Sequence, residues 1–257
     1  MQIAGLQKTT LVDYPGKVAA TVFTRGCSFR CPFCHNPELV LPERFSPLIS
    51  VEGFFQFLEK RQGKLQGVCI TGGEPLLHAD AGRFAERIKK LGFLVKLDTN
   101  GSFPDRLKEL IDSGNLDYIA MDIKSPLSKY AQTAQISNFK YQISNKNPKT
   151  KLEQNNLEEK NKIKDKGLQS DIKKSISLIM NSSIDYEFRT TVCHPLHLPE
   201  DFEEIGKLIK GAKRYYIQNF VHSKHNDEKT KFEPFTELEL ENALQIISQE
   251  VKNSIVR

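Results

Sequence analysis

Six short apolar runs recur along this chain, and stretches with helical periodicity separate most of them. The runs are rich in apolar and β-branched residues with little polar alternation, as in parallel strands buried on both faces. They are Val18–Thr24, Gly67–Thr71, Phe93–Asp98, Leu116–Asp122, Asp185–Val192 and Lys213–Asn219. This alternation predicts an α/β fold with right-handed crossovers on one mainly parallel sheet, either a barrel or an open doubly wound sheet.

Helices are expected between and after these runs. Ser50, for example, can cap the segment that follows it, in which apolar residues repeat at helical spacing. The expected helices are Val51–Arg61, Ala81–Leu91, Pro104–Ile111, Asp171–Met180, Pro199–Ile209 and Glu237–Lys252. In barrels and in open α/β sheets alike, ligands bind beyond the carboxyl ends of the strands. Residues just after each strand are therefore the candidates for chemistry.

Composition argues against several classes of protein. With 257 residues, the chain can bury a core without disulfide or metal staples. Five cysteines are an odd and sparse count, unlike that of a secreted disulfide scaffold. No apolar run approaches the roughly 20 residues that span a bilayer, and Met1–Lys17 lacks the apolar centre of a signal peptide. We therefore expect a cytoplasmic protein that does not bind a membrane.

The net charge of +5 is concentrated in one segment, residues 131–170. This segment contains eight Lys, six Asn and five Gln, and its eight Lys against four acidic residues give +4 of the total. Its composition cannot bury enough apolar surface to offset the entropy of ordering, so we expect a mobile insertion. The remainder of the chain is close to neutral, which predicts no nucleic-acid partner.

Three cysteines follow the first expected strand within eight residues, with the spacing C-x3-C-x2-C; they are Cys27, Cys31 and Cys34. A short loop of this kind can wrap thiolates around one soft metal centre, and three ligands leave a position open for another molecule. Cys69 and Cys193 stand alone and supply no natural fourth ligand. Three alternatives stay open at this point: buried structural cysteines, a zinc site closed by His35, and haem attachment.

The cysteine loop resembles the cluster motif of the radical S-adenosylmethionine (SAM) superfamily. Its wider context, Asp13-Tyr14-Pro15-Gly16-Lys17 through Cys34-His35-Asn36-Pro37, is similar to activating enzymes of glycyl-radical enzymes, above all those of anaerobic ribonucleoside-triphosphate reductases. The resemblance covers nearly the whole chain apart from the Lys/Asn-rich segment. It implies a single radical SAM domain over residues 1–257, folded as a partial (β/α)6 TIM-like barrel. It also implies that the three cysteines hold a 4Fe–4S cluster whose fourth iron binds SAM.

Two motifs at the ends of expected strands match the same family. Gly72-Gly73-Glu74 matches the motif that holds the SAM amino group. By itself it indicates a backbone that approaches a ligand closely, with Glu74 as an acceptor for an ammonium group. Asp98-Thr99-Asn100 matches the element near the ribose and the methionine end of SAM. By itself it indicates a loop with Asn-Gly turn chemistry.

Two further candidates follow along the chain. Asp122 and Lys124 match the Asp-x-Lys element of activating enzymes, in which the Lys approaches SAM. The resemblance also implies that this Asp, together with the equivalent of Asp98, helps to bind a monovalent cation. Arg189 lies inside an expected barrel strand, where an unpaired cation is costly, so its partner is the SAM carboxylate or a buried glutamate. No catalytic residue is expected beyond the cluster and the SAM site.

The resemblance implies an oxygen-sensitive oxidoreductase. An electron from the reduced cluster cleaves SAM to methionine and a 5′-deoxyadenosyl radical, which takes a hydrogen atom from a glycine of a partner. The implied partners are a glycyl-radical enzyme, namely an anaerobic ribonucleotide reductase, and an electron donor such as flavodoxin or ferredoxin. Because Asn36–Ile70 contains only Cys69, a single cluster is expected. The alternatives are a carboxy-deazaguanine synthase-like enzyme that acts on a small molecule and a zinc-binding interaction module.

Overall fold

One mixed sheet organises the molecule. The computed structural model describes residues 1–135, 151–222 and 232–257, with the side chains of the long helix α6 described from residue 166 onward. Across the sheet the strands follow one another in chain order. They are β1 (Ile3–Thr10), β2 (Ala19–Thr24), β3 (Gly67–Gly72), β4 (Leu94–Thr99), β5 (Tyr118–Asp122), β6 (Asp185–Val192), β7 (Tyr215–Asn219) and β8 (Ser254–Val256).

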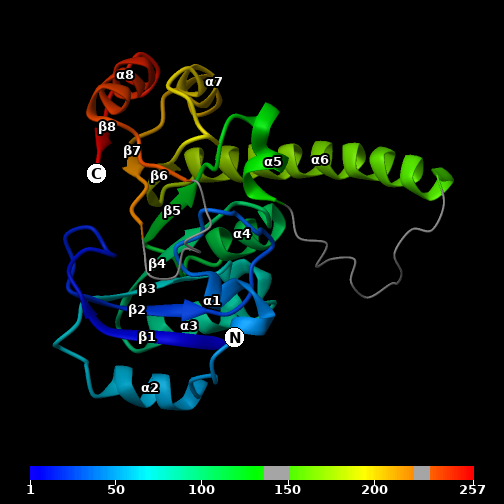
Figure 1. The fold of residues 1–257 in the computed structure, drawn as a ribbon. Coiled ribbons are helices and arrows are strands. Elements are labelled where there is room, and N and C mark those ends of the chain that lie inside the picture. Colours follow the sequence, from blue (N-terminus) through cyan, green and yellow to red (C-terminus); the bar gives the residue numbers. More distant parts are fainter. Residues whose placement is uncertain (136–150, 223–231) are drawn as a thin grey trace.

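The six strands expected from the sequence are confirmed as β2 to β7, and all of them are parallel. The sequence pattern does not predict the two edges, β1 and β8. β1 pairs antiparallel with β2, and two register shifts disturb its alternation. β8 pairs parallel with β7 and has only three residues. Among the described strands β8 does not pair with β1, so the curved sheet is the partial barrel that the resemblance implies (Figure 1).

Helices pack their apolar sides against this sheet to form one continuous core (Figure 1). They are α1 (Pro37–Val40), α2 (Val51–Glu59), α3 (Ala81–Lys90), α4 (Pro104–Asp112), α5 (Tyr130–Ala134), α6 (Lys151–Met180), α7 (Asp201–Leu208) and α8 (Glu237–Ile247). Short 3-10 turns are η1 (Pro42–Arg44), η2 (Pro75–Leu77) and η3 (Leu127–Lys129). The Oγ of Ser50 accepts from the N–H of Gly53 at 3.3 Å, which confirms the expected cap of α2.

Helices α2, α3, α4, α7 and α8 match expected segments, with ends that differ by a few residues. Helix α6 differs more, because it begins at Lys151 instead of Asp171. From residue 166 onward, where its side chains are described, the buried apolar residues are Leu168, Ile172, Ile176 and Ile179. These residues repeat at helical spacing, and they include the segment predicted from the sequence.

The expected mobile insertion, residues 131–170, falls partly on described structure. Residues 131–134 belong to α5, and 151–170 form the first part of α6. Residues 136–150 lie outside the described part of the chain, so the mobility of the insertion stays a prediction. None of the helices that the structure describes is both long and apolar enough to cross a membrane.

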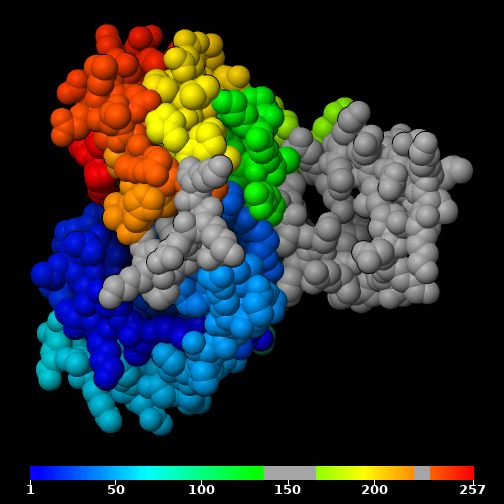
Figure 2. All heavy atoms as spheres, viewed as in Figure 1, coloured from blue at the N-terminus to red at the C-terminus, as the bar shows by residue number. Residues whose placement is uncertain are grey.

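The two ends of the sheet lie on the same side of the molecule. Figure 2 shows the N-terminal part of the chain in blue and the C-terminal part in orange and red on this side. The described strands thus curve around an interior that stays open between the edges β1 and β8. Polar residues at the carboxyl ends of the parallel strands face this interior, and they form the site described next.

Candidate functional site

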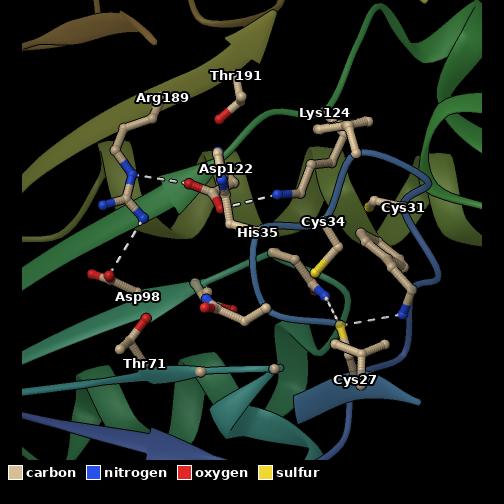
Figure 3. A pocket seen from close by; sticks show the side chains of 18 of the residues that line it. Cys27, Cys31, Cys34, His35, Thr71, Asp98, Asp122, Lys124, Arg189 and Thr191 are labelled. Carbon is tan, nitrogen blue, oxygen red and sulfur yellow. Dashed lines mark hydrogen bonds and ion pairs between the residues drawn. The ribbon is translucent and has the colours of Figure 1, made fainter. Parts of the chain in front are cut away.

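A cavity of about 390 Å³ lies at the carboxyl ends of the parallel strands. It is lined by the loop after β2 and by residues at the ends of β3 to β7 (Figure 3). Of the residues singled out in the sequence it collects Cys27, Cys31, Cys34, Gly72, Gly73, Asp98, Thr99, Asn100, Asp122, Lys124 and Arg189. The topology explains this gathering, because the carboxyl ends of parallel strands meet at one edge. Glu74 is the candidate that does not line the cavity.

The cysteine loop follows β2 and is held in place by its backbone. The N–H of Arg30 donates to the carbonyl of Ala134 in α5 at 2.9 Å, and its guanidinium donates back to the carbonyl of Cys27 at 2.8 Å. The N–H of Cys34 donates to the carbonyl of Cys31 at 3.1 Å. The chain itself therefore places all three thiols on one wall of the cavity.

The three thiols are free, with Cys27 buried and the other two half-buried. Burial raises the pKa of Cys27 to about 12 and the pKa of Cys31 to about 11, and it also raises the pKa of Cys34. Thiolates at these positions therefore need a nearby positive centre, which an iron ion would supply when bound. Cys69 and Cys193 are fully buried and do not line the cavity. Three cysteines without a fourth fit a 4Fe–4S cluster that keeps one iron open.

Two N–H groups point at the sulfur of Cys27 (Figure 3). The backbone N–H of Phe29 donates to it at 3.4 Å, and the side-chain amide of Asn100 donates at 3.6 Å. The same amide donates to the Oγ of Ser28 at 3.1 Å. Asn100 thus links the turn after β4 to the proposed cluster ligand Cys27. Hydrogen bonds to sulfur tune the reduction potential of an iron–sulfur cluster, so this contact would affect the potential of a cluster bound here.

Close backbone packing against Thr24 and Gly26 requires glycine at positions 72 and 73. Gly72 has a φ of +121°, and a Cβ at this position would overlap the backbone of Thr24. A Cβ on Gly73 would overlap the carbonyl of Gly26. The N–H of Gly73 donates to the carbonyl of Thr24 at 2.9 Å. The backbone that lies close to both glycines is therefore that of Thr24 and Gly26, at the start of the cysteine loop. Both glycines also line the cavity.

Glu74 has a different place from the one expected for an acceptor of a ligand ammonium group. It is fully buried, and its carboxylate accepts from the N–H of Leu76 at 3.0 Å, from Oγ1 of Thr99 at 2.8 Å and from the N–H of Asn100 at 2.7 Å. Burial raises the pKa of Glu74 to about 7, although these hydrogen bonds oppose the rise. Glu74 therefore fixes the Thr99–Asn100 turn from behind the cavity wall.

The wall opposite the cysteines carries a group of charged side chains (Figure 3). Nε of Arg189 donates to Asp122 Oδ1 at 2.9 Å, and Nη2 of Arg189 lies 3.5 Å from Asp98 Oδ2. Lys124 Nζ donates to Asp122 Oδ2 at 3.0 Å. Burial alone would raise the pKa of Asp122, but Arg189 and Lys124 outweigh it and hold this pKa well below its usual range. The nearest buried glutamate, Glu187, is 3.8 Å from Arg189, so the aspartates are the closer partners.

Lys96 belongs to this group and was missed in the sequence. It is 1% exposed, is paired with Asp98, and its Nζ lies 3.7 Å from the sulfur of Cys69. Although burial lowers the pKa of Lys96, Asp98 outweighs that effect and keeps the amine charged. The sequence did carry a signal, since a lysine inside a strand expected to be buried needs an anionic partner on the same face.

Comparison with known proteins decides the family. A model of the Radical SAM superfamily matches residues 21–212, which is most of the chain. The chain belongs to the radical SAM superfamily. As a radical SAM protein it is expected to use a 4Fe–4S cluster and SAM, and all three cysteines of the loop line the cavity. This assignment sets aside the zinc-binding module considered from the sequence.

Similarity to individual relatives indicates which group of the superfamily this radical SAM enzyme belongs to. A candidate glycyl-radical enzyme activating enzyme of Methanocaldococcus jannaschii is 31% identical over 257 residues, covering 99% of this chain and 95% of that protein. The 7-carboxy-7-deazaguanine synthase of Thermoplasma acidophilum is 30% identical over 128 residues, covering 50% of this chain and 57% of that protein. Full-length similarity therefore places the enzyme among the activating enzymes of glycyl-radical enzymes.

A solved structure supports the fold. A radical SAM methyltransferase from Sphaerobacter thermophilus superimposes with a TM-score of 0.65 at 14% identity, covering 95% of this chain and 67% of that one. At this identity the likeness concerns the fold alone. It agrees with the partial barrel formed by β1 to β8.

Proposed function

We propose that Cys27, Cys31 and Cys34 hold one 4Fe–4S cluster, that SAM binds across the cavity, and that the enzyme activates an anaerobic ribonucleoside-triphosphate reductase. The main support is that three free thiols face a charged wall within one cavity of a chain that matches an activating enzyme along its whole length. When bound, the cluster and SAM supply an electron and a 5′-deoxyadenosyl radical, which can remove a hydrogen atom from a glycine.

The cavity lining has groups for both ends of an amino acid. Lys124 and Arg189 line the cavity and can donate N–H groups to the SAM carboxylate. Because Glu74 is turned away, we assign the ammonium group of SAM to the backbone of Gly72 and Gly73. These roles keep SAM oriented toward the thiol wall, so the groups that react are held close together.

Apolar side chains protect the reacting groups. Phe23, Phe29 and Val40 line the cavity between its polar walls, which limits the water near a reactive intermediate. A glycine of the partner enzyme suits such a site, because its backbone can enter without a side chain. We place the reaction in the cytoplasm, with flavodoxin or ferredoxin as the electron donor.

Replacement of single cysteines tests the ligand assignment. Cys27→Ala, Cys31→Ala and Cys34→Ala should each abolish SAM cleavage after anaerobic reconstitution, because each removes one of only three ligands. Cys69→Ala is the matched control, since Cys69 is buried outside the cavity, and it should retain iron content and SAM cleavage. SAM cleavage at the normal rate in any of the first three variants would refute the assignment.

A second candidate function is modification of a small molecule, as in 7-carboxy-7-deazaguanine synthases. Its support is the similarity to the Thermoplasma acidophilum protein over half of this chain. The two functions differ in where the radical goes. An anaerobic ribonucleotide reductase that gains a glycyl radical in the presence of this enzyme supports activation. Formation of 7-carboxy-7-deazaguanine without such a radical supports the alternative.

A further inference from the structure

Asp98 and Asp122 end neighbouring parallel strands and face the same cavity. Two carboxylates that share a site repel each other, and they require a positive charge between them if both stay ionised. The resemblance to activating enzymes implies that a monovalent cation supplies this charge. Such an ion would need carboxylate oxygens that are free to face it.

The position between the two carboxylates is filled by a side chain. The guanidinium of Arg189 lies between Asp98 and Asp122 (Figure 3) and reaches them through different nitrogens, at 3.5 Å and 2.9 Å. The carboxylate oxygens therefore face N–H groups where a metal ion would need them as ligands. An arginine stays charged at any physiological pH, so this positive charge is permanent.

The register of the sheet builds this arrangement. Asp122 of β5 and Arg189 of β6 are partners in the parallel ladder, so the backbone itself sets the two side chains beside each other. Lys96 precedes Asp98 by two residues on β4 and points to the same side of the strand. The contacts thus depend on rigid strands of the barrel.

The charges of this group are already balanced. Its carboxylates are Asp98, Asp122 and Glu187, and its cations are Lys96, Lys124 and Arg189, with Arg257 at its edge 3.6 Å from Glu187. Within this group the cations match or outnumber the carboxylates, so the group itself carries no net negative charge that would attract a further cation. A dehydrated metal ion here would have to displace charged hydrogen bonds from buried carboxylates.

We propose that Arg189 takes the place of the monovalent cation, so that this enzyme binds SAM without Na⁺ or K⁺. The inference rests on the proposed SAM site and adds to it the source of the positive charge. Besides its proposed contact with the SAM carboxylate, Arg189 acts here through the two aspartates, because it holds Asp98 and Asp122 in one geometry on the charged wall.

Thallium and SAM binding test this inference on the full-length, reconstituted protein. We expect no ²⁰⁵Tl⁺ resonance that K⁺ displaces, a measurement that requires no SAM. We also expect the Kd for SAM to change by less than about twofold when tetramethylammonium chloride replaces KCl at equal ionic strength. A displaceable Tl⁺ site, or a loss of SAM affinity of about tenfold that millimolar K⁺ restores, would overturn the proposal.

Arg189→Gln provides the complementary test. The variant keeps a polar side chain, which is shorter and uncharged, and leaves Asp98 and Asp122 without the shared guanidinium. In tetramethylammonium buffer we expect it to bind SAM at least about tenfold more weakly, and K⁺ should restore much of this loss. A loss that no cation restores would contradict the proposal and assign Arg189 to the SAM carboxylate alone.

The matched control is Arg214→Gln, which removes an arginine that pairs with a single aspartate, Asp185, away from the cavity lining. It should show no dependence on the cation. If Arg189→Gln does not fold, the two wild-type measurements still decide the question. A protein that binds no SAM in any buffer would contradict the proposed function, whereas the Tl⁺ measurement tests the inference separately.

Discussion

The buried carboxylate of Glu74 shows how a motif residue can serve the site without entering it. Its three hydrogen bonds connect the turn after β3 with the turn after β4. Those two turns carry Gly73 and Asn100, which line the cavity. The side chain that sequence reasoning assigned to a ligand therefore supports the backbone around that ligand.

The pKa of Glu74 predicts a pH dependence of stability. Burial raises this pKa from 4.5 to about 7, so the folded chain keeps a proton that the unfolded chain releases at lower pH. The free energy of unfolding contributed by Glu74 therefore falls as the pH rises from about 4.5 to about 7. Glu74→Gln cannot titrate, and it should flatten this part of the profile.

Urea unfolding of the cluster-free protein between pH 4.5 and pH 8 measures this effect. Glu86→Gln is the matched control, because Glu86 forms an exposed pair with Lys90 on α3 and its loss should leave the slope of the profile unchanged. Parallel profiles for wild type and Glu74→Gln would contradict the account of Glu74.

At the residue scale, the sequence indicates the placement of groups that are close together in the chain, whereas the ligand roles of the candidate residues stay predictions. Cys27, Cys31 and Cys34 line one cavity because a short loop after one strand carries all three. The place of Lys96 depends on Asp98 and Cys69, and that of Glu74 depends on Thr99 and Asn100. The contacts of Lys96 with Cys69 and of Glu74 with Thr99 and Asn100 join different strands or turns, so hydrophobic periodicity does not reveal them, although a lysine within a buried strand already indicates an anionic partner.

At the scale of elements, the junction between β3 and the cysteine loop depends on glycine. Gly72→Ala should destabilise the protein by about 2 kcal/mol or more, because its φ is unfavourable for alanine and the new Cβ meets backbone of β2. Gly82→Ala in α3 is the matched control, since nothing lies within 4 Å of a Cβ there. It should be neutral or stabilising by up to about 1 kcal/mol. Urea unfolding compares the two, and equal effects would contradict the packing argument.

The sequence predicts those strands and helices whose apolar residues follow a regular pattern. β2 to β7 have continuous apolar runs and were found, whereas β1 has three consecutive exposed residues and bulged pairing. Helix α6 was found only over its last turns, where its apolar residues meet the core. Helix α5 was assigned to the insertion, because a helix of five residues has too few positions to show a period.

Helix α5 limits how much of the insertion can be deleted without disturbing the cysteine loop. Ala134 accepts a hydrogen bond from the N–H of Arg30 at 2.9 Å, and the thiol of Cys31 lies 3.8 Å from the same carbonyl. Replacing residues 136–165 by a flexible linker of about ten residues should therefore preserve SAM cleavage. Extending the deletion back to residue 131 should lower both iron content and SAM cleavage. The prediction fails if the two deletions behave alike.

The whole molecule combines a thiol wall and a charged wall at one end of a partial barrel. The three cysteines come from one loop, whereas Asp98, Asp122 and Arg189 come from three successive parallel strands. Rigid strands thus fix the charged wall, and a loop pinned to α5 fixes the thiol wall. This division suits a site in which two bound groups must meet in one orientation.

Electron paramagnetic resonance tests the central claim most directly. The reconstituted enzyme, SAM and a reductant are incubated anaerobically with an anaerobic ribonucleotide reductase, with Cys27→Ala enzyme as the control. Wild-type enzyme should produce the doublet of a glycyl radical on the reductase, and Cys27→Ala should produce none. SAM cleavage by the wild-type enzyme without any glycyl radical on the reductase would contradict the proposed activation.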